Sequence, residues 1–177
     1  MGKWIVNLTL WIALGLWWSA AVADEDNLYF SGSLVNEPCM LAAEDAQVEL
    51  DFLSVVDKDL YLNGRTRGRP MTLHLQNCQL GTGNSRVSIM FSGPESIDPP
   101  GLLVLQSGDV HGVLLGLETV DGKPLVLNET HNMGAFIKGS NLINFNAYLQ
   151  GESQALVDRN IGLGAFYTAL SFTLSYD

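Results

Sequence analysis

Residues 164–177 at the C-terminal end of the chain read GAFYTALSFTLSYD. Large apolar or aromatic residues occupy every second position, with only Thr168 interrupting: Phe166, Leu170, Phe172, Leu174 and Tyr176. Most of the intervening residues are small or polar. A repeat of two residues is typical of a β-strand with one face toward a hydrophobic core. We therefore predict a long strand over residues 164–176, whose apolar face must be covered and whose backbone edges must be paired.

The first 23 residues have the three parts of an export signal. Lys3 supplies the positive start, residues 4–18 are mainly apolar, and Ala21-Val22-Ala23 forms a small-residue cleavage site. The apolar run is shorter than the roughly 20 residues that a membrane span requires. We expect cleavage after Ala23 rather than an uncleaved anchor, and no direct insertion of the mature chain into a membrane.

The composition of the mature chain limits its partners. Removing 23 of the 177 residues leaves 154, which is long enough for a single domain. The loss of Lys3 changes the formal net charge from −10 to −11. This acidic balance argues against nucleic acid, whose phosphates require basic patches, and it suits a basic protein partner.

A second alternating stretch follows the predicted cleavage site. Its apolar parity holds Leu28, Phe30, Gly32 and Leu34, and the segment ends at Glu37-Pro38 because proline cannot donate to a β-ladder. A glycine inside such a pattern usually marks a bulge or a close approach to another backbone. We predict a strand here, with Gly32 at a tight place on the surface that receives it.

The remainder of the chain predicts short strands separated by turns. Apolar alternation places strands near residues 48–52, 71–75, 87–91, 113–117 and 143–149. Residues 57–69 and 150–160 are predicted loops, residues 81–84 a hairpin turn, and Asp121-Gly122 a tight turn. No segment has a sustained helical period with caps. Many short strands with turn signals favour an all-β sandwich in one domain.

Two cysteines, Cys39 and Cys78, lie in a chain that is expected to enter an oxidising compartment. One disulfide is the simplest prediction. A metal pair or a redox site is the alternative, but the chain has no C-x-x-C motif and no histidine beside either cysteine.

The sequence gives little sign of enzyme chemistry. His74, His111 and His131 lie in separate segments without metal-ligand spacing, and no nucleophile signature is present. The glycine-rich residues 81–84 are not followed by a helix pattern that would hold a phosphate. We predict no cofactor, no metal site and no enzymatic activity.

Taken in order, several features of the chain resemble a chaperone–usher pilus subunit. They are residues 30–35 (FSGSLV) ahead of Pro38-Cys39, residues 73–78 (LHLQNC), residues 145–149 (FNAYL), Gly164 at the fourteenth position from the end, and the penultimate Tyr176. The resemblance spans essentially all of the mature chain. Among such pilins, it is most similar to the minor and adaptor subunits of P-type pili.

This resemblance implies an incomplete immunoglobulin-like β-sandwich, the pilin fold, which is completed by a donated strand. Residues 1–23 would be the cleaved signal, residues 24–37 the donor-strand arm, and residues 38–177 the pilin domain. In the arm, the alternating positions Leu28, Phe30, Gly32 and Leu34 would enter the groove of a neighbouring subunit.

The resemblance also implies the partners of the groove. A strand of a periplasmic chaperone would fill it first, and the arm of the next pilin would follow. Gly164, Phe166, Leu170, Phe172, Leu174 and Tyr176 would line its acceptor side, and the carboxylate of Asp177 would anchor on basic residues of the chaperone. An outer-membrane usher would then pass the subunit to a surface pilus that supports cell adhesion.

Three other interpretations stay open at this point. Residues 28–36 could pair inside their own domain and make a self-contained exported β-sandwich. A carbohydrate-binding tip adhesin usually has an additional lectin domain, for which 154 residues leave no room. A pilus terminator would differ in having part of its groove closed.

Overall fold

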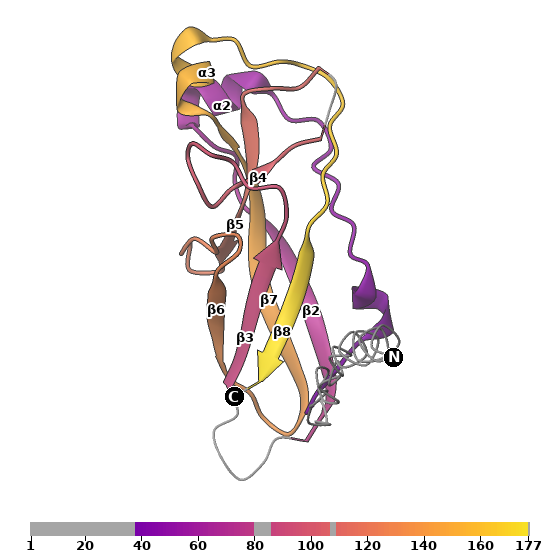
Figure 1. Cartoon of the computed structure of the whole chain (residues 1–177). Helices are drawn as coiled ribbons and strands as arrows, with labels where there is room; N and C mark the ends of the chain where they lie inside the picture. Colours follow the sequence, from indigo (N-terminus) through magenta and orange to yellow (C-terminus); the bar gives the residue numbers. More distant parts are fainter. Residues whose placement is uncertain (1–37, 80–85, 107–108, 177) are drawn as a thin grey trace, which may run out of the picture. The chain divides into compact units, whose positions relative to one another are not determined.

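The computed structural model describes residues 38–79, 86–106 and 109–176. Antiparallel strands form two sheets that are arranged as a sandwich (Figure 1). The five-stranded sheet contains, in spatial order, β1 (Met40–Leu41), β2 (Arg69–Cys78), β7 (Gly139–Gly151), β5 (Val113–Thr119) and β4 (Leu103–Val104). The three-stranded sheet contains β6 (Thr130–Ala135), β3 (Arg86–Ser92) and β8 (Ser171–Tyr176).

The pairing of β2 with β7 shows why the alternation in sequence forms a sheet. In this ladder Leu73 lies opposite Ile143, and Thr72 lies opposite Asn144. Leu73 and Ile143 are buried, whereas the Thr72 hydroxyl donates a hydrogen bond of 2.8 Å to Asn144 Oδ1 on the other face. One face of the pair therefore contributes to the core and the other carries polar cross-strand contacts.

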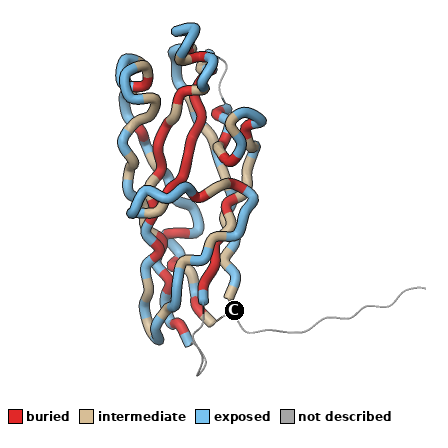
Figure 2. The backbone as a smooth tube through the Cα atoms, turned by 90° about the vertical axis from the view of Figure 1, so that its left-hand side faces the viewer, coloured by how far each residue is buried: buried red, intermediate tan, exposed pale blue. Residues whose placement is uncertain are grey.

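The hydrophobic core lies between the two sheets. The ring of Phe91 in β3 lies 5.2 Å from the ring of Phe145 in β7, so the contact joins the two layers. Buried positions, red in Figure 2, follow the central strands. Strand β5 is buried on both faces, since Leu114 and Glu118 are as well covered as Leu115 and Leu117.

Several predicted elements are confirmed. Strands cover the predicted segments 71–75, 87–91, 113–117 and 143–149. The tight turn at residues 121–122 is also present, with Gly122 at φ 79° and its N–H donating to the Thr119 carbonyl at 2.9 Å. A positive φ is the conformation for which glycine is suited. Because both sheets are antiparallel and pack face to face, the predicted sandwich is confirmed.

The prediction of loops at residues 57–69 and 150–160 is partly wrong, because each contains a short helix. These are α2 (Asp57–Asn63) and α3 (Ser153–Asp158), and a 3₁₀ turn, η1 (Ala43–Ala46), precedes them. The residues before α2 and α3 make no side-chain capping bond. Helices of fewer than two turns without caps leave no clear sequence signal.

One predicted strand is absent, another is shorter than predicted, and the strands on either side of the predicted hairpin turn do not form a hairpin. Residues 48–52 form no ladder with any described strand, and the long C-terminal strand is reduced to β8 with a single bridge between Tyr167 and Gln106. Residues 81–84 lie outside the described residues, but β2 and β3 on either side of them belong to different sheets. The connection therefore crosses between layers.

The predicted disulfide between Cys39 and Cys78 is present. It joins the segment just before β1 to the last residue of β2, and both cysteines are buried. Next to it, the N–H of Gln79 donates to the Pro38 carbonyl. Among the described residues, no helix has the length and apolar character needed to cross a membrane.

Candidate functional site

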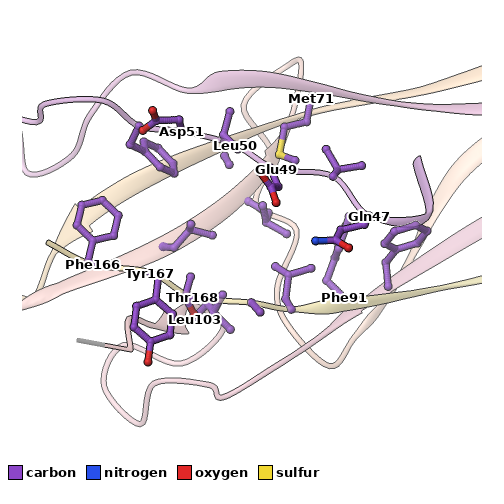
Figure 3. A pocket seen from close by; sticks show the side chains of 18 of the residues that line it. Gln47, Glu49, Leu50, Asp51, Met71, Phe91, Leu103, Phe166, Tyr167 and Thr168 are labelled. Atoms are coloured by element: carbon purple, nitrogen blue, oxygen red, sulfur yellow. The ribbon is translucent and has the colours of Figure 1, made fainter. Parts of the chain in front are cut away.

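An open groove of about 980 Å³ runs between two segments, residues 46–53 and residues 164–172 (Figure 3). Both sheets contribute to its floor, which is entirely apolar: Met71, Leu73, Phe91, Leu103, Leu115, Leu117, Phe145 and Ala147. The groove therefore opens directly onto the core of the sandwich. It is long and apolar, which suits an extended chain better than a small polar molecule.

The first wall of the groove is an extended segment without a strand partner. Within the described part of the chain, no backbone–backbone hydrogen bond involves residues 48–52. Leu50 is half-buried and Phe52 buried, whereas Glu49 and Asp51 are exposed. The alternation of a strand is thus present, but its ladder is missing.

The second wall is formed by β8 and the residues before it. Strand β8 pairs with β3 from Ser171 opposite Ser92 to Tyr176 opposite Val87. In the described ranges, no strand pairs with the other edge of β8. The segment that leads into β8 lies across the groove from the first wall, as Figure 3 shows for Phe166, Tyr167 and Thr168 opposite Gln47, Glu49, Leu50 and Asp51.

The side chains of this second wall alternate as the sequence predicted. Phe166, Leu170, Phe172, Leu174 and Tyr176 are all half-buried and packed against the core. Tyr167, on the other parity, is 69% exposed. Thr168 interrupts the apolar series without leaving the inner face, since it is half-buried and its hydroxyl donates to the Val104 carbonyl at 2.9 Å.

These walls and the floor together define a site for an added strand. Backbone groups on two facing edges can bond to an extended peptide, and half-buried apolar side chains can be covered by alternate residues of that peptide. Covering apolar surface is favourable by roughly 25 cal/mol per Å². The arrangement is a place in the sandwich where one strand is missing.

The structure brings together only part of the residue set predicted for the groove. Gly164, Phe166, Leu170 and Phe172 line it, whereas Leu174 and Tyr176 continue the same face of β8 beyond it. Asp177 lies outside the described residues. The same holds for the whole predicted arm, including Leu28, Phe30, Gly32 and Leu34.

The opposite wall and the floor were not predicted from the sequence as parts of the site. The signal for the wall was present, because Val48, Leu50 and Phe52 alternate with polar residues, but it was interpreted as an ordinary strand. Phe52 of this wall and Phe166 of the second wall meet across the groove, with their rings 6.3 Å apart. Which strand covers which face is a property of the tertiary fold that one sequence does not reveal.

A charged cluster lies on the other face of the five-stranded sheet from the groove. Arg65 Nη2 lies 2.8 Å from Glu118 Oε2, and the Arg65 guanidinium stacks 3.5 Å from the centre of the Tyr148 ring. Burial raises the pKa of Tyr148; the Arg65 charge opposes this rise and the Glu118 charge adds to it. Gly116 makes room for the Tyr148 ring, which a Cβ at that position would overlap.

No metal-type site is found within the described ranges, where no group of three or more His, Cys, Asp or Glu side chains is close enough to hold an ion. His74 Nδ1 lies 3.0 Å from Asp45 Oδ2 on the outside of β2, and this pair has no third partner of that kind. The groove is therefore the main candidate site.

An antiparallel sandwich with an apolar groove in place of one strand is an incomplete immunoglobulin-like fold, the fold of pilins. Comparison with known proteins confirms this class. The model of the fimbrial protein family matches residues 28–177, so the chain belongs to that family.

Individual relatives and solved structures agree with this assignment. The fimbrial-like protein YfcP of Escherichia coli is 32% identical over 89% of this chain and 87% of its own length. The fimbrial adapter PapK of Escherichia coli is 26% identical over 89% and 92%. The solved P pilus rod subunit PapA has a TM-score of 0.69 at 21% identity, covering 80% of this chain and 100% of the solved chain. A subunit of a solved chaperone–usher pilus has a TM-score of 0.70 at 22% identity, with 86% and 96% covered.

The chain is thus a subunit of a chaperone–usher pilus, a structural protein of the cell surface. Its family consists of structural proteins rather than enzymes, and pilins of this family polymerise with neighbouring subunits.

Proposed function

We propose that this pilin polymerises by donor-strand exchange. Residues 24–37 act as the donor arm, and residues 38–177 form the domain that accepts the arm of a neighbouring subunit. The observation that carries this proposal is the groove, in which residues 48–52, which form no ladder, and the segment that leads into β8 line opposite sides of an apolar floor.

The dimensions and the pattern of the arm suit this role. Residues 27–34 would extend over about 26 Å at 3.3 Å per residue, and these eight residues would lie along a wall to which residues 46–53 contribute. Leu28, Phe30 and Leu34 would cover the half-buried side chains of the groove. Gly32 would lie where the floor leaves no room for a side chain.

The same geometry supports the proposed partners of the subunit before assembly. The apolar face of β8 is only half-covered, so the free subunit needs a partner in the periplasm. A strand of the pilus chaperone would occupy the groove, with the Asp177 carboxylate on a basic site of the chaperone, until the outer-membrane usher exchanges it for an arm. Cleavage after Ala23 would release the donor arm.

A minor or adaptor position in the pilus is supported by the likeness to PapK, which is named as a fimbrial adapter. In this position the subunit would join two other pilins, accept one arm and donate its own. Its contribution to cell adhesion would then be to connect the adhesive part of the fibre with the rest.

A substitution in the arm tests the exchange. Gly32→Asn places a side chain on the parity that enters the groove, whereas Ser33→Asn places the same side chain on the outward parity. We expect Gly32→Asn to slow the joining of two subunits at least tenfold and Ser33→Asn to leave it unchanged. Native mass spectrometry of mixed chaperone-bound subunits measures the rate.

The control for folding is the yield of the chaperone complex, which both variants should form normally because residues 32 and 33 lie in the arm rather than in the groove. A Gly32→Asn subunit that joins its neighbour at the normal rate would remove the arm from the mechanism.

A further inference from the structure

A second hollow, of about 650 Å³, adjoins the groove at Phe52. It is lined by residues 52, 54–56, 59 and 63 on one side and by the consecutive residues 65–69 on the other. Phe52 lines both this hollow and the groove. The segment that forms the wall of the groove continues past Phe52 into residues 54–56, which line the hollow. We call it the arginine hollow, because Arg65, Arg67 and Arg69 all line it.

The charge of the arginine hollow is unusual for this chain. The protein has a formal net charge of −10, yet three arginines occur within residues 65–69. Arg65 is engaged by Glu118 at 2.8 Å. Among the described residues, neither Arg67 nor Arg69 has a carboxylate oxygen within 4.0 Å, although Asp59 also lines the hollow.

The two other arginines lie in the hollow beside the wall segment of the groove. Arg69 Nη1 donates to the Asp51 carbonyl at 2.7 Å, and its guanidinium lies 5.8 Å from the centre of the Phe52 ring. Arg69 is thus held against the wall of the groove. Arg67 is exposed beside it. A guanidinium without a carboxylate partner at the edge of an apolar groove favours an acidic ligand.

We infer that the arginine hollow binds an acidic side chain at the end of the strand that fills the groove, the strand being the arm of a second copy of this chain. This inference rests on the proposed donor-strand exchange. The arm has acids at both ends of its apolar segment, Asp24-Glu25-Asp26 before Leu28 and Glu37 after Leu34. Whichever way the arm enters the groove, an acidic residue lies two or three positions beyond the last apolar residue of the arm, which is Leu28 or Leu34.

This contact would favour arms with acidic ends over arms with neutral ends, and it would supply only a small part of the affinity of the arm for the groove. Exposed ion pairs contribute about 0.2–1 kcal/mol each, which is at most about a fivefold change in affinity. Such pairs also depend on salt, because their charges are screened over about 10 Å at 0.1 M. An arm with neutral ends would fill the groove but would lose this contribution.

The test is a binding titration at low salt between the mature chain, residues 24–177, and a labelled peptide of residues 24–37. The fluorescence anisotropy of the peptide reports binding. The protein variants are Arg67→Gln and the double variant Arg67→Gln with Arg69→Gln. The matched control is Lys123→Gln with Arg159→Gln, which removes two positive charges outside both hollows. A second peptide carries Asn or Gln in place of its four acids, and a third carries Gly32→Asn.

We expect the double variant to raise the Kd of the wild-type peptide about fivefold, Arg67→Gln to raise it less, and the control to leave it unchanged. For the neutral peptide all proteins should bind alike. Because Arg69 also contacts the groove wall, the measurements with the neutral peptide distinguish loss of charge from damage to the groove. A peptide with Glu37→Gln alone then identifies which end of the arm reaches the hollow.

Equal affinity of every protein for the wild-type peptide would overturn the arginine hollow as a binding site and leave strand exchange standing. Equal weakening of the wild-type and neutral peptides by the arginine variants would overturn it as well, because the effect would then be structural. If the wild-type peptide bound no better than the Gly32→Asn peptide, the proposed exchange itself would fail.

Discussion

Gly116 occupies a position where any larger residue would conflict with a neighbour. It lies opposite Tyr148 in the ladder between β5 and β7, and a Cβ there would overlap the Tyr148 ring. We predict that Gly116→Ala destabilises the domain by about 1–3 kcal/mol, the usual cost of overpacking a well-filled site. Chemical denaturation of the mature chain measures the loss.

A double-mutant cycle shows whether the ring is the cause. In a Tyr148→Ala background the overlap is removed, so Gly116→Ala should cost much less there than in the wild type. An equal cost in both backgrounds would place the strain elsewhere in β5.

The buried Tyr148 also predicts a dependence of stability on alkaline pH. Burial raises its pKa from the ordinary value of 10.0, so the folded state favours the neutral phenol more than the unfolded state does. The stabilisation is fully present below pH 10 and is lost as the pH rises through the raised folded pKa. We predict that Tyr148→Phe reduces the fall in the free energy of unfolding above about pH 10.

The measurement is a series of denaturation curves at rising alkaline pH for the wild type, Tyr148→Phe and Tyr167→Phe. Tyr167 is 69% exposed, so its replacement should leave the alkaline fall as it is in the wild type. If the free energy of unfolding of Tyr148→Phe fell with rising pH as steeply as that of the wild type, the Tyr148 phenol would contribute nothing to the alkaline loss of stability.

At the scale of elements, the strands that could be predicted are those with one apolar and one polar face. Leu73 and Leu75 alternate with His74 and Gln76 in the sequence, and β2 buries the first pair and exposes the second. A period of two is a local property, so it survives in a single sequence. The inner face of β8 was predicted for the same reason.

Other elements depend on contacts that no local pattern reveals. Helices α2 and α3 contain seven and six residues, too few to show a 3.6-residue period. The N–H of Ile161, just after α3, donates to the Tyr61 hydroxyl of α2 at 3.0 Å, and this contact joins segments 100 residues apart in the sequence. The position of these helices is therefore fixed by tertiary packing.

The residues of the candidate site likewise divide into those that a local pattern predicted and those that only the fold reveals. Its β8 side was predictable from the alternation of residues 166–176, and the disulfide from two cysteines in an exported chain. The opposite wall around Phe52, the floor from β5 and β7, and the arginine hollow each need a pairing across the sandwich. The alternation of residues 48–52 predicted a strand, but only the fold shows that this strand lacks a partner.

At the scale of the whole molecule, the domain without a donated strand should be incompletely stabilised. Its core is open along the groove, and the apolar residues of β8 are only half-covered. We predict that the mature chain lacking residues 24–36 unfolds at low temperature alone and gains about 5–11 °C with the arm peptide at 100 times its Kd. This range follows from the roughly 2.7 kcal/mol of linkage at that concentration and about 2–4 °C per kcal/mol for a domain of this size.

Circular dichroism is the suitable measurement, because all four tryptophans of the chain lie within residues 1–23 and would leave with the signal. The Gly32→Asn peptide is the matched control and should give little or no shift, since the proposed exchange leaves no room for a side chain at this position. A shortened chain that is stable alone and ignores the peptide would be a finished domain. In that outcome the groove would be a surface feature, and subunits would have to join through other contacts. A large shift with the wild-type peptide alone would mean that the missing strand completes the core, and that the energy of folding is released at the step that links the subunits.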